Sequence, residues 1–492
     1  MKDSSQNNQN KSRRLAFLLI LIISIGVFFW LHSLAGLSFP VPWEDEAVFV
    51  MQGKALADHG SMFSPSLNPN RVVEWMPPGY MIFLGGVLRF PGNILFLSRL
   101  ASFLLVILVF LLLAYTIWKK TKHAWLTLIL IALYMTSRYF IMAGNMARME
   151  ALVLALITIA IYCFTAKKPF IALAILTLTP IVHPNGLYFF IAGVLYFFST
   201  EKFSLKNIST LTVLIWFLVF GAWLAYGIHI IQHWVDFKFD MTQQMERKAG
   251  RNFWEAVKQT KYIFGFTAIV LAGVYSWLKK EKWLLMLVYF AGASLFINRV
   301  GQEMWYEVYD SFAFILLCIV ILYIVYSFNS KVMTVIGLVL VIAIGFKSGA
   351  IEKSLDYRRD INFNGLRLSD SVPYIQQSDI QRVREYILSQ RKNSTKIRVK
   401  FEPRGDALLF QNPEDSLIAP IHVHKEKTMF PDQDCDLYIV HVSKYFPPVW
   451  STYPVQWALN NAGINPTEKK YEILRRNETE VWYANVAIPR NQ

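Results

Sequence analysis

Cysteine is scarce in this sequence, which has three in 492 residues, at Cys163, Cys318 and Cys435. The first two fall inside long apolar runs, and Cys435 stands alone. Three thiols placed in this way cannot build a disulfide framework or a metal–thiolate cluster. Internal repeats are also lacking, and the polar N-terminal tail is the one low-complexity segment.

Charged side chains are also few, at 17% of the chain, while 54% is hydrophobic. Runs of about 17 or more apolar residues recur between Leu15 and Phe346, and each can cross about 30 Å of hydrocarbon as a helix. A polytopic α-helical membrane protein with about eleven transmembrane helices is therefore expected, rather than a large soluble helical protein. The expected spans are 15–36, 95–117, 122–140, 149–166, 170–182, 185–199, 208–228, 259–278, 282–298, 311–328 and 331–347.

No small-residue cleavage site closes the first span, so it is expected to remain as an uncleaved helix. The net charge of +15 is distributed over the loops, and lysines mark every second break between spans. By the positive-inside rule these breaks and the N-terminus are cytoplasmic. The pattern requires the turn at His183-Pro184 to face outward, so 170–182 and 185–199 are two short helices rather than one broken helix. The basic charge then requires no nucleic acid partner.

Three parts of the chain follow from this topology. Residues 1–14 are a cytoplasmic tail, 15–349 a transmembrane domain with a long outer loop at 37–94, and 350–492 a periplasmic α/β domain of an inner-membrane protein. In the outer loop, Glu46–Asp58 has helical character and stops at Gly60, whereas Tyr80–Phe90 is too short to span. In the C-terminal part, a helix is expected at 378–390 and strands at 396–401, 435–442 and 480–486.

Three consecutive carboxylates, Glu44, Asp45 and Glu46, open the outer loop at the edge of the first span. Carboxylates at a membrane surface cost solvation free energy unless water, a cation or a hydrogen-bond donor satisfies them. Such residues can take a proton from an acceptor hydroxyl or amine, or hold a cation beside a phosphate leaving group. The alternative is an acidic cap on an interfacial helix.

The outer loop resembles that of the family 39 glycosyltransferases, which use polyprenyl-phosphate sugars and have the C-type membrane fold. This family includes protein O-mannosyltransferases and the aminoarabinose transferase of lipid A. The likeness covers residues 13–200. It rests on Pro42-Trp43-Glu44-Asp45-Glu46-Ala47, His59-Gly60, Glu74-x-x-Pro77-Pro78-Gly79-Tyr80, Ser98-Arg99-Leu100-Ala101-Ser102 and Ala147-Arg148-Met149-Glu150.

The resemblance implies that Asp45 is the catalytic base and that Glu46 supports its geometry or a metal. Glu150 would lie near Asp45 across the outer face, at a position where the family more often has Asp. Glu44 and Glu74 are further supporting acids. Met76 stands where the lipid A branch has Lys, so aminoarabinose is not implied as the sugar.

Basic and aromatic residues of the outer loops supply candidates for substrate binding. Cations are needed to hold the donor phosphate and to offset charge as it leaves, although arginines at these places also contact lipid headgroups. The phosphate candidates are Arg138, Arg148, Arg247, Lys248 and Arg251, and the pocket candidates are His183, Tyr80 and Trp305. A divalent metal on Asp45 and Glu150 stays open, because no ligand spacing demands one.

The sequence thus predicts a membrane glycosyltransferase that moves a hexosyl or pentosyl group, with inversion, from a polyprenyl-phosphate donor to an acceptor on the outer face. The acceptor is a cell-envelope glycan, a lipid or a protein. A transporter or flippase for lipid-linked sugars is the alternative, but it would place charges at mid-membrane, whereas these spans are nearly free of charge. A non-catalytic assembly protein is a third interpretation.

Overall fold

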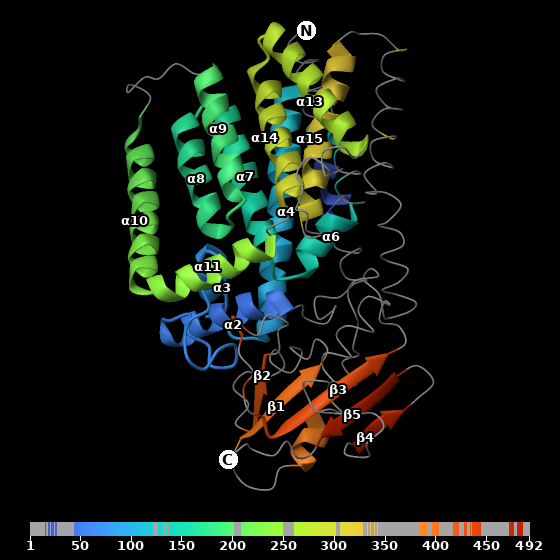
Figure 1. Ribbon diagram of the computed structural model, residues 1–492. Helices are drawn as coiled ribbons and strands as arrows, with labels where there is room; N and C mark the ends of the chain where they lie inside the picture. Colours follow the sequence, from blue (N-terminus) through green and yellow to red (C-terminus); the bar gives the residue numbers. More distant parts are fainter. Residues whose placement is uncertain are drawn as a thin grey trace.

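The computed structural model describes residues 44–121, 137–200, 208–248, 260–301 and 306–327 of the helical part of the chain. In the C-terminal part it describes 384–390, 396–402, 417–422, 428–430, 435–443, 472–476 and 480–485, with single residues elsewhere. The helices form a bundle, and the sheet lies beyond one end of it, with α2 and α3 between the two (Figure 1). The predicted boundary at residue 350 falls outside the described residues.

As far as residue 327, the regular secondary structure of the described residues is helical, and the loop 60–78 joins α2 to α3. Two short helices of the segment predicted to be the outer loop, α2 (Glu44–His59) and α3 (Gly79–Val87), precede the bundle. The bundle helices are α4 (Ile94–Thr121), α6 (Arg138–Asn145), α7 (Met149–Thr165), α8 (Pro169–Val182), α9 (Gly186–Thr200), α10 (Thr210–Gln232), α13 (Thr260–Leu278), α14 (Lys282–Gly301) and α15 (Glu307–Ser327). Helix α11 (Trp234–Lys248) runs across the bundle axis (Figure 1).

Three of the described helices are long and apolar enough to cross a membrane, namely α4, α10 and Glu307–Val325 of α15. Shorter apolar helices occupy Met149–Thr165, Pro169–Val182, Gly186–Thr200, Gly265–Leu278 and Lys282–Ile297. The helical membrane protein that the sequence predicted is therefore confirmed, whereas the number of eleven spans stays a prediction. The first, third and last predicted spans fall largely outside the described residues.

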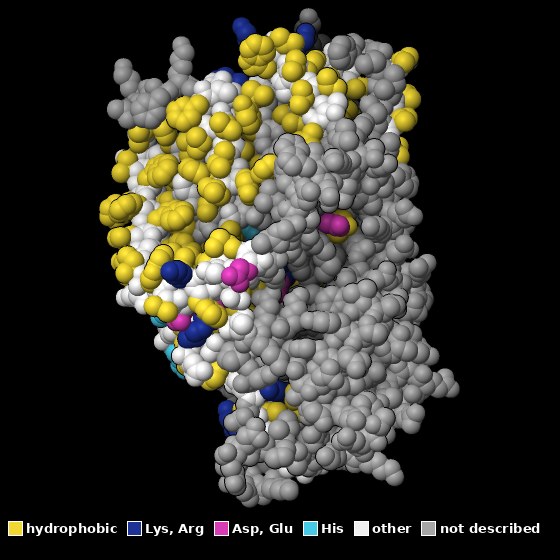
Figure 2. Space-filling view, viewed as in Figure 1, with side chains coloured by type: hydrophobic (Ala, Val, Ile, Leu, Met, Phe, Trp, Pro, Cys, Tyr) yellow, Lys and Arg dark blue, Asp and Glu magenta, His cyan; other side chains and the backbone are white. Residues whose placement is uncertain are grey.

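The outward face of the bundle is apolar, as the broad hydrophobic surface in Figure 2 shows. Helix α10 contributes most plainly, because Phe217, Leu218 and Phe220 each expose more than half of their surface. In water such a surface would favour aggregation or a partner, but in hydrocarbon it is the expected outer face of a spanning helix.

The predicted helix of the outer loop is confirmed as α2, and its end is confirmed at Gly60. Gly60 has a φ of +71°, and its N–H donates to Leu56 O at 3.0 Å, a left-handed ending that suits glycine. Residues Ala47 to Val50 of α2 are fully buried. This turn of α2 is therefore packed on all of its faces.

The turn at His183 lies at the same end of the bundle as α2 and α3. An added Cβ on Gly79, at the start of α3, would lie 2.7 Å from the carbonyl oxygen of Ile181. On Gly186 it would lie 2.2 Å from the carbonyl carbon of Thr179. Helices α8 and α9 are two separate short helices, as predicted, and the close approach of their ends requires glycine.

The C-terminal part contains a five-stranded sheet with the order β2-β1-β3-β5-β4. Strands β1 (Ile397–Glu402), β3 (Leu437–Ser443) and β5 (Glu480–Asn485) confirm the three predicted strands. The prediction missed β2 (Ile418–Ile421) and β4 (Glu472–Arg476). Both are edge strands: β2 is four residues long and carries a proline, and β4 is rich in charge, so neither shows the alternation of a half-buried strand.

The sheet mixes the two kinds of pairing. Strand β1 pairs in parallel with β2 and β3, while β5 pairs antiparallel with both β3 and β4. A short helix at 384–389 precedes β1, within the helix predicted at 378–390. The expected α/β character of this part is therefore present in the described residues.

Hydrogen bonds join the sheet side of the molecule to the loop that follows α2. The N–H of His422 donates to Ser66 O at 3.0 Å, and the amide of Gln433 donates to Pro65 O at 3.0 Å. In the opposite direction, the loop donates to the sheet side: the side-chain amide of Asn68 donates to Met429 O at 2.9 Å. These bonds place the sheet directly beyond α2.

Candidate active site

An arginine joins two of the predicted acids. Arg148 Nη1 lies 3.0 Å from Asp45 Oδ2, and its Nε and Nη2 donate to the two oxygens of Glu150 at 3.2 and 3.1 Å. The side chains of Arg148 and Glu150 are 7% and 3% exposed, whereas that of Asp45 is 20% exposed. Asp45 is therefore the most accessible carboxylate of this group.

A second ion pair lies behind the first. Arg99 donates to Glu46 through Nε at 2.8 Å and through Nη2 at 2.7 Å, and neither side chain has any exposed surface. Glu46 Oε1 also accepts the backbone N–H of Ala147 at 2.6 Å. Because Ala147 precedes Arg148 in the chain, Glu46 fixes the backbone that carries Arg148 beside Asp45.

Local structure explains why these groups meet. Asp45 and Glu46 are in the first turn of α2, and Glu150 is in the first turn of α7, where the helix dipole favours negative charge. Arg148 is the extended residue before α7, with φ −130° and ψ 147°. Two helix starts thus converge, and the arginine between them compensates the carboxylates.

Burial by itself lowers the pKa of Arg148, but the charges of Glu150 and Asp45 and their hydrogen bonds raise it above the ordinary value. The guanidinium therefore stays charged at any physiological pH. A fixed cation with planar, paired donors suits a phosphate group. An accessible carboxylate next to it suits a proton acceptor.

Arg99 and Ser102, in the segment Ser98-Arg99-Leu100-Ala101-Ser102 that contributes to the family resemblance, have a structural role at the start of α4. Residues three apart lie on one face of a helix, so Arg99 and Ser102 both face the outer loop. Ser102 Oγ lies 3.0 Å from the hydroxyl of Tyr80, which is fully buried. Tyr80, a predicted pocket residue, also packs edge-on against Phe49. In this structure the buried ring of Tyr80 packs against α2 and supports it.

Glu74 lies in a second polar group near the start of α11. Its Oε1 is 2.7 Å from His229 Nε2, and its backbone N–H donates to Asp240 Oδ2 at 2.7 Å. Arg71 binds both oxygens of Asp240, at 2.8 and 2.6 Å. This group ties the outer loop to α10 and α11.

Sequence reasoning assigned no role to Arg71, Arg99, His229 or Asp240. The buried ion pair of Arg99 could have been predicted, because a charge inside an apolar span indicates a buried partner. Nothing in the sequence indicated a role for Arg71, His229 or Asp240. Arg71 and Asp240, for example, are 169 positions apart, and no motif links them.

The remaining predicted residues are placed less fully. His183 is buried, accepts the N–H of Asn185 at its Nδ1 at 3.0 Å, and lies edge-on to Tyr306 with ring centroids 5.5 Å apart. Residues outside the described part, at least in their side chains, are Glu44, Arg138, Arg247, Lys248, Arg251 and Trp305.

Arg148 occupies the position between Asp45 and Glu150, the two acids suggested for a metal. Within the described ranges, no group of three or more His, Cys, Asp and Glu side chains is arranged to hold a metal ion. The chemistry of the described site is that of carboxylates and an arginine.

No protein-family model and no curated protein matches this sequence. Among solved structures, the fold matches ArnT from Cupriavidus metallidurans in the apo state and the same protein bound to undecaprenyl phosphate. In both comparisons the TM-score is 0.54 and the identity 12%, over 96% of this chain and 99% of that chain.

The chain is thus a helical membrane protein with a fold like that of ArnT. The resemblance that short motifs indicated is confirmed as a resemblance in fold. A fold does not by itself establish an activity, so the function is argued from the site.

Proposed function

We propose that this chain transfers a sugar from a polyprenyl-phosphate carrier to a hydroxyl or amine of an acceptor on the outer face of the membrane. The observation that carries the proposal is the pairing of an accessible carboxylate, Asp45, with a buried arginine, Arg148. The ArnT structure with bound undecaprenyl phosphate supports a polyprenyl phosphate as the carrier.

In the proposed reaction Asp45 removes the proton from the acceptor while the acceptor atom attacks the anomeric carbon. The new bond forms on the face opposite the phosphate, so the configuration inverts. The bond between the anomeric carbon and the phosphate oxygen breaks, and the phosphate leaves with the electron pair. Arg148 binds the phosphate oxygens and stabilises their increasing charge.

The position of the charges supports an enzyme rather than a transporter. Asp45, Glu46 and Glu150 lie in first turns of helices, and Arg99 is near the start of α4. A transporter of the same lipid would need polar groups near the middle of the membrane.

The test uses the full chain, purified in detergent, with a panel of polyprenyl-phosphate hexoses and pentoses. Release of polyprenyl phosphate is measured for the intact protein and for Asp45→Asn. We expect release to fall at least about 100-fold, because the proton acceptor is lost. Glu246→Gln, an exposed acid of α11, is the matched control and should keep the wild-type rate.

Equal release from the intact protein and Asp45→Asn would remove Asp45 as the base. If no donor is turned over but reconstituted vesicles move a labelled lipid-linked sugar between leaflets, the transporter becomes the better interpretation. Both variants must elute as one monodisperse peak for the comparison to hold.

A further inference from the structure

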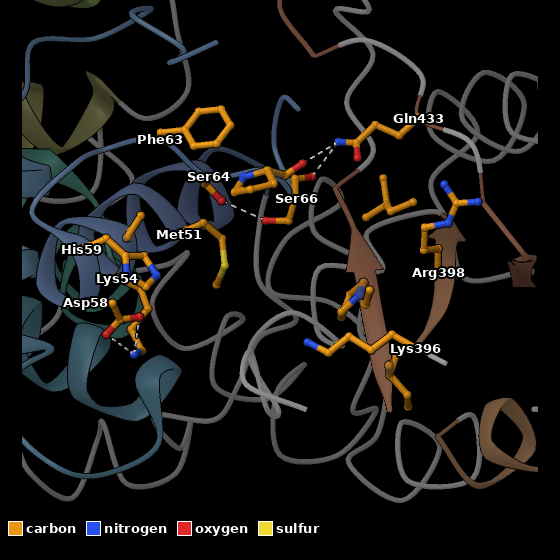
Figure 3. Close-up of a pocket in the computed structure, with 16 residues that line it drawn as sticks. Met51, Lys54, Asp58, His59, Phe63, Ser64, Ser66, Lys396, Arg398 and Gln433 are labelled. Carbon is orange, nitrogen blue, oxygen red and sulfur yellow. Dashed lines mark hydrogen bonds and ion pairs between the residues drawn. The ribbon is translucent and has the colours of Figure 1, made fainter. Parts of the chain in front are cut away.

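A cavity of about 520 Å³ lies between the second half of α2 and the C-terminal sheet (Figure 3). Lys54, Asp58 and His59 of α2 line one side, and Lys396 and Arg398 line the other. Binding pockets for small ligands span about 300–1,000 Å³, so the cavity is large enough for a sugar unit with its substituents.

The lining of the cavity is basic. Among the described residues that line it, Asp58 is the only acid, and it lies 2.5 Å from Lys54, so these two charges compensate each other. Lys396 has no ion-pair partner among the described residues and extends toward α2 in Figure 3. Arg398 contacts Asp436 at 3.4 and 3.5 Å, longer than the usual 2.7–2.9 Å of a strong charged pair. A net positive charge remains for an anion.

The other lining residues suit a carbohydrate. Phe63 exposes 36% of its surface at the edge of the cavity, and an aromatic ring of this kind can stack on the apolar face of a sugar. Gln433 is held in place by the carbonyls of Pro65 and Ser66, at 3.0 and 3.2 Å. The wall is therefore fixed before any ligand binds, which lowers the entropic cost of binding.

The cavity is separate from the candidate active site. Lys54 follows Asp45 by nine residues on one helix, which is about 14 Å along its axis. Most of the residues that line the cavity belong to α2, the loop after it and strands β1 and β2, and the sheet lies on the side of α2 away from the bundle (Figure 1). A ligand here is too far from Asp45 to react there.

We propose that this cavity binds a phosphate- or carboxylate-bearing sugar unit of the acceptor, and so selects acidic acceptors and holds them while a distant unit reacts at Asp45. This inference rests on the proposed function, because it assumes that the acceptor is a glycan or glycolipid. It assigns the C-terminal sheet a part in acceptor recognition.

The test is a binding measurement without donor, so it does not depend on catalysis. Trigalacturonate and mannose 6-phosphate are titrated into the full chain in neutral detergent micelles by calorimetry, with maltotriose as the uncharged control. We expect the acidic sugars to bind and maltotriose to bind at least about tenfold more weakly, a difference of about 1.4 kcal/mol.

Lys396→Gln together with Arg398→Gln should weaken acidic-sugar binding at least about tenfold, and Lys396→Glu alone should weaken it as well. Lys279→Gln, at an exposed lysine of the bundle outside the cavity, is the matched control and should bind as the intact protein does. Polyprenyl phosphate release without acceptor should be unchanged in the cavity variants.

Equal affinity for trigalacturonate and maltotriose, or unchanged binding by the Lys396 and Arg398 variants, would overturn the inference even if donor turnover is found. Competition by phosphatidylglycerol added to the micelles would assign the cavity to a lipid headgroup and would also overturn it. Absence of donor turnover by the intact protein, with acidic-sugar binding retained, would overturn the proposed function and with it the acceptor role, but not the acidic-sugar site itself.

Discussion

At the scale of single residues, the buried pair of Glu46 and Arg99 organises the site without being exposed to substrate. Both side chains are fully buried, and Glu46 also accepts the N–H of Ala147. A buried ion pair gives little net stability, but removing one partner leaves an uncompensated charge. The main role of the pair is therefore structural: it fixes the backbone that carries Arg148.

Arg99→Met should destabilise the protein by about 3–5 kcal/mol, because Glu46 would be left buried without its cation. Adding Glu46→Leu should recover most of this loss, since no buried charge then remains. Polyprenyl phosphate release should stay low in the double variant, because nothing accepts the Ala147 N–H. Thermal unfolding and the release assay measure the two effects, and recovery of both would show that Glu46 does not position Arg148.

The buried hydroxyl of Tyr80 should make the stability of the protein depend on pH. Burial raises its pKa well above 10.0, and the charges of Glu46 and Glu150 add to the shift. The hydroxyl therefore stays protonated in the folded protein, while the unfolded chain releases this proton above about pH 10. Its contribution to stability is full below that pH and decreases above it by about 1.4 kcal/mol per pH unit.

Unfolding midpoints between pH 9 and 11 check this for the intact protein and for Tyr80→Phe. The variant should lose about 1–3 kcal/mol at pH 8, because Ser102 loses its hydrogen-bond partner. It should also decline less steeply above pH 10. Parallel curves for the two proteins would contradict the assigned role of burial at Tyr80.

At the scale of elements, the site depends on where helices begin. Helices α2 and α7 start next to each other, so their first turns bring Asp45, Glu46 and Glu150 together around Arg148. The start of α9 has a different requirement, because its backbone passes against the end of α8.

Gly186→Ala should destabilise the protein by about 1–3 kcal/mol, since the added Cβ would meet the backbone of Thr179 at 2.2 Å. Gly221→Ala is the matched control: it is also helical, but nothing lies within 4 Å of its added Cβ. That variant should be neutral or slightly stabilising, because alanine favours helix. Thermal unfolding in detergent compares them, and an equal effect of both would contradict the close packing of α8 and α9.

At the scale of the whole molecule, polar bonds and an aromatic contact between described residues hold the sheet beyond the bundle. Phe430 is buried and lies edge-on to Trp75, with ring centroids 6.1 Å apart, and it also meets the ring of His422.

Phe430→Ala should loosen this junction, because truncating a buried phenylalanine costs about 3–5 kcal/mol. Hydrogen exchange of the His422 amide, which donates to Ser66 O, should speed up markedly. The amides of β3 that pair with β5 serve as the internal control and should exchange as before. Unchanged exchange at His422 would mean that Phe430 does not hold the sheet in place.

The sequence by itself determined the membrane class, the helix after Asp45, the two short helices at His183 and three strands of the sheet. Most of these follow from local patterns, namely apolar runs, helix stops and alternation, whereas the two short helices at His183 follow from the loop charges and the positive-inside rule. It also indicated Asp45 and Glu150, because motifs keep their order along the chain. None of these features depends on knowing which distant segments meet.

Only the tertiary structure decided how the charges pair. Glu46 and Arg99 are 53 positions apart, and Arg71 and Asp240 are 169 apart, so no spacing relates them. The edge strands β2 and β4 were also decided by tertiary context, since pairing with a neighbour rather than their own composition makes them strands. Pairing across such distances depends on the packed geometry of the whole chain, which local propensity does not contain.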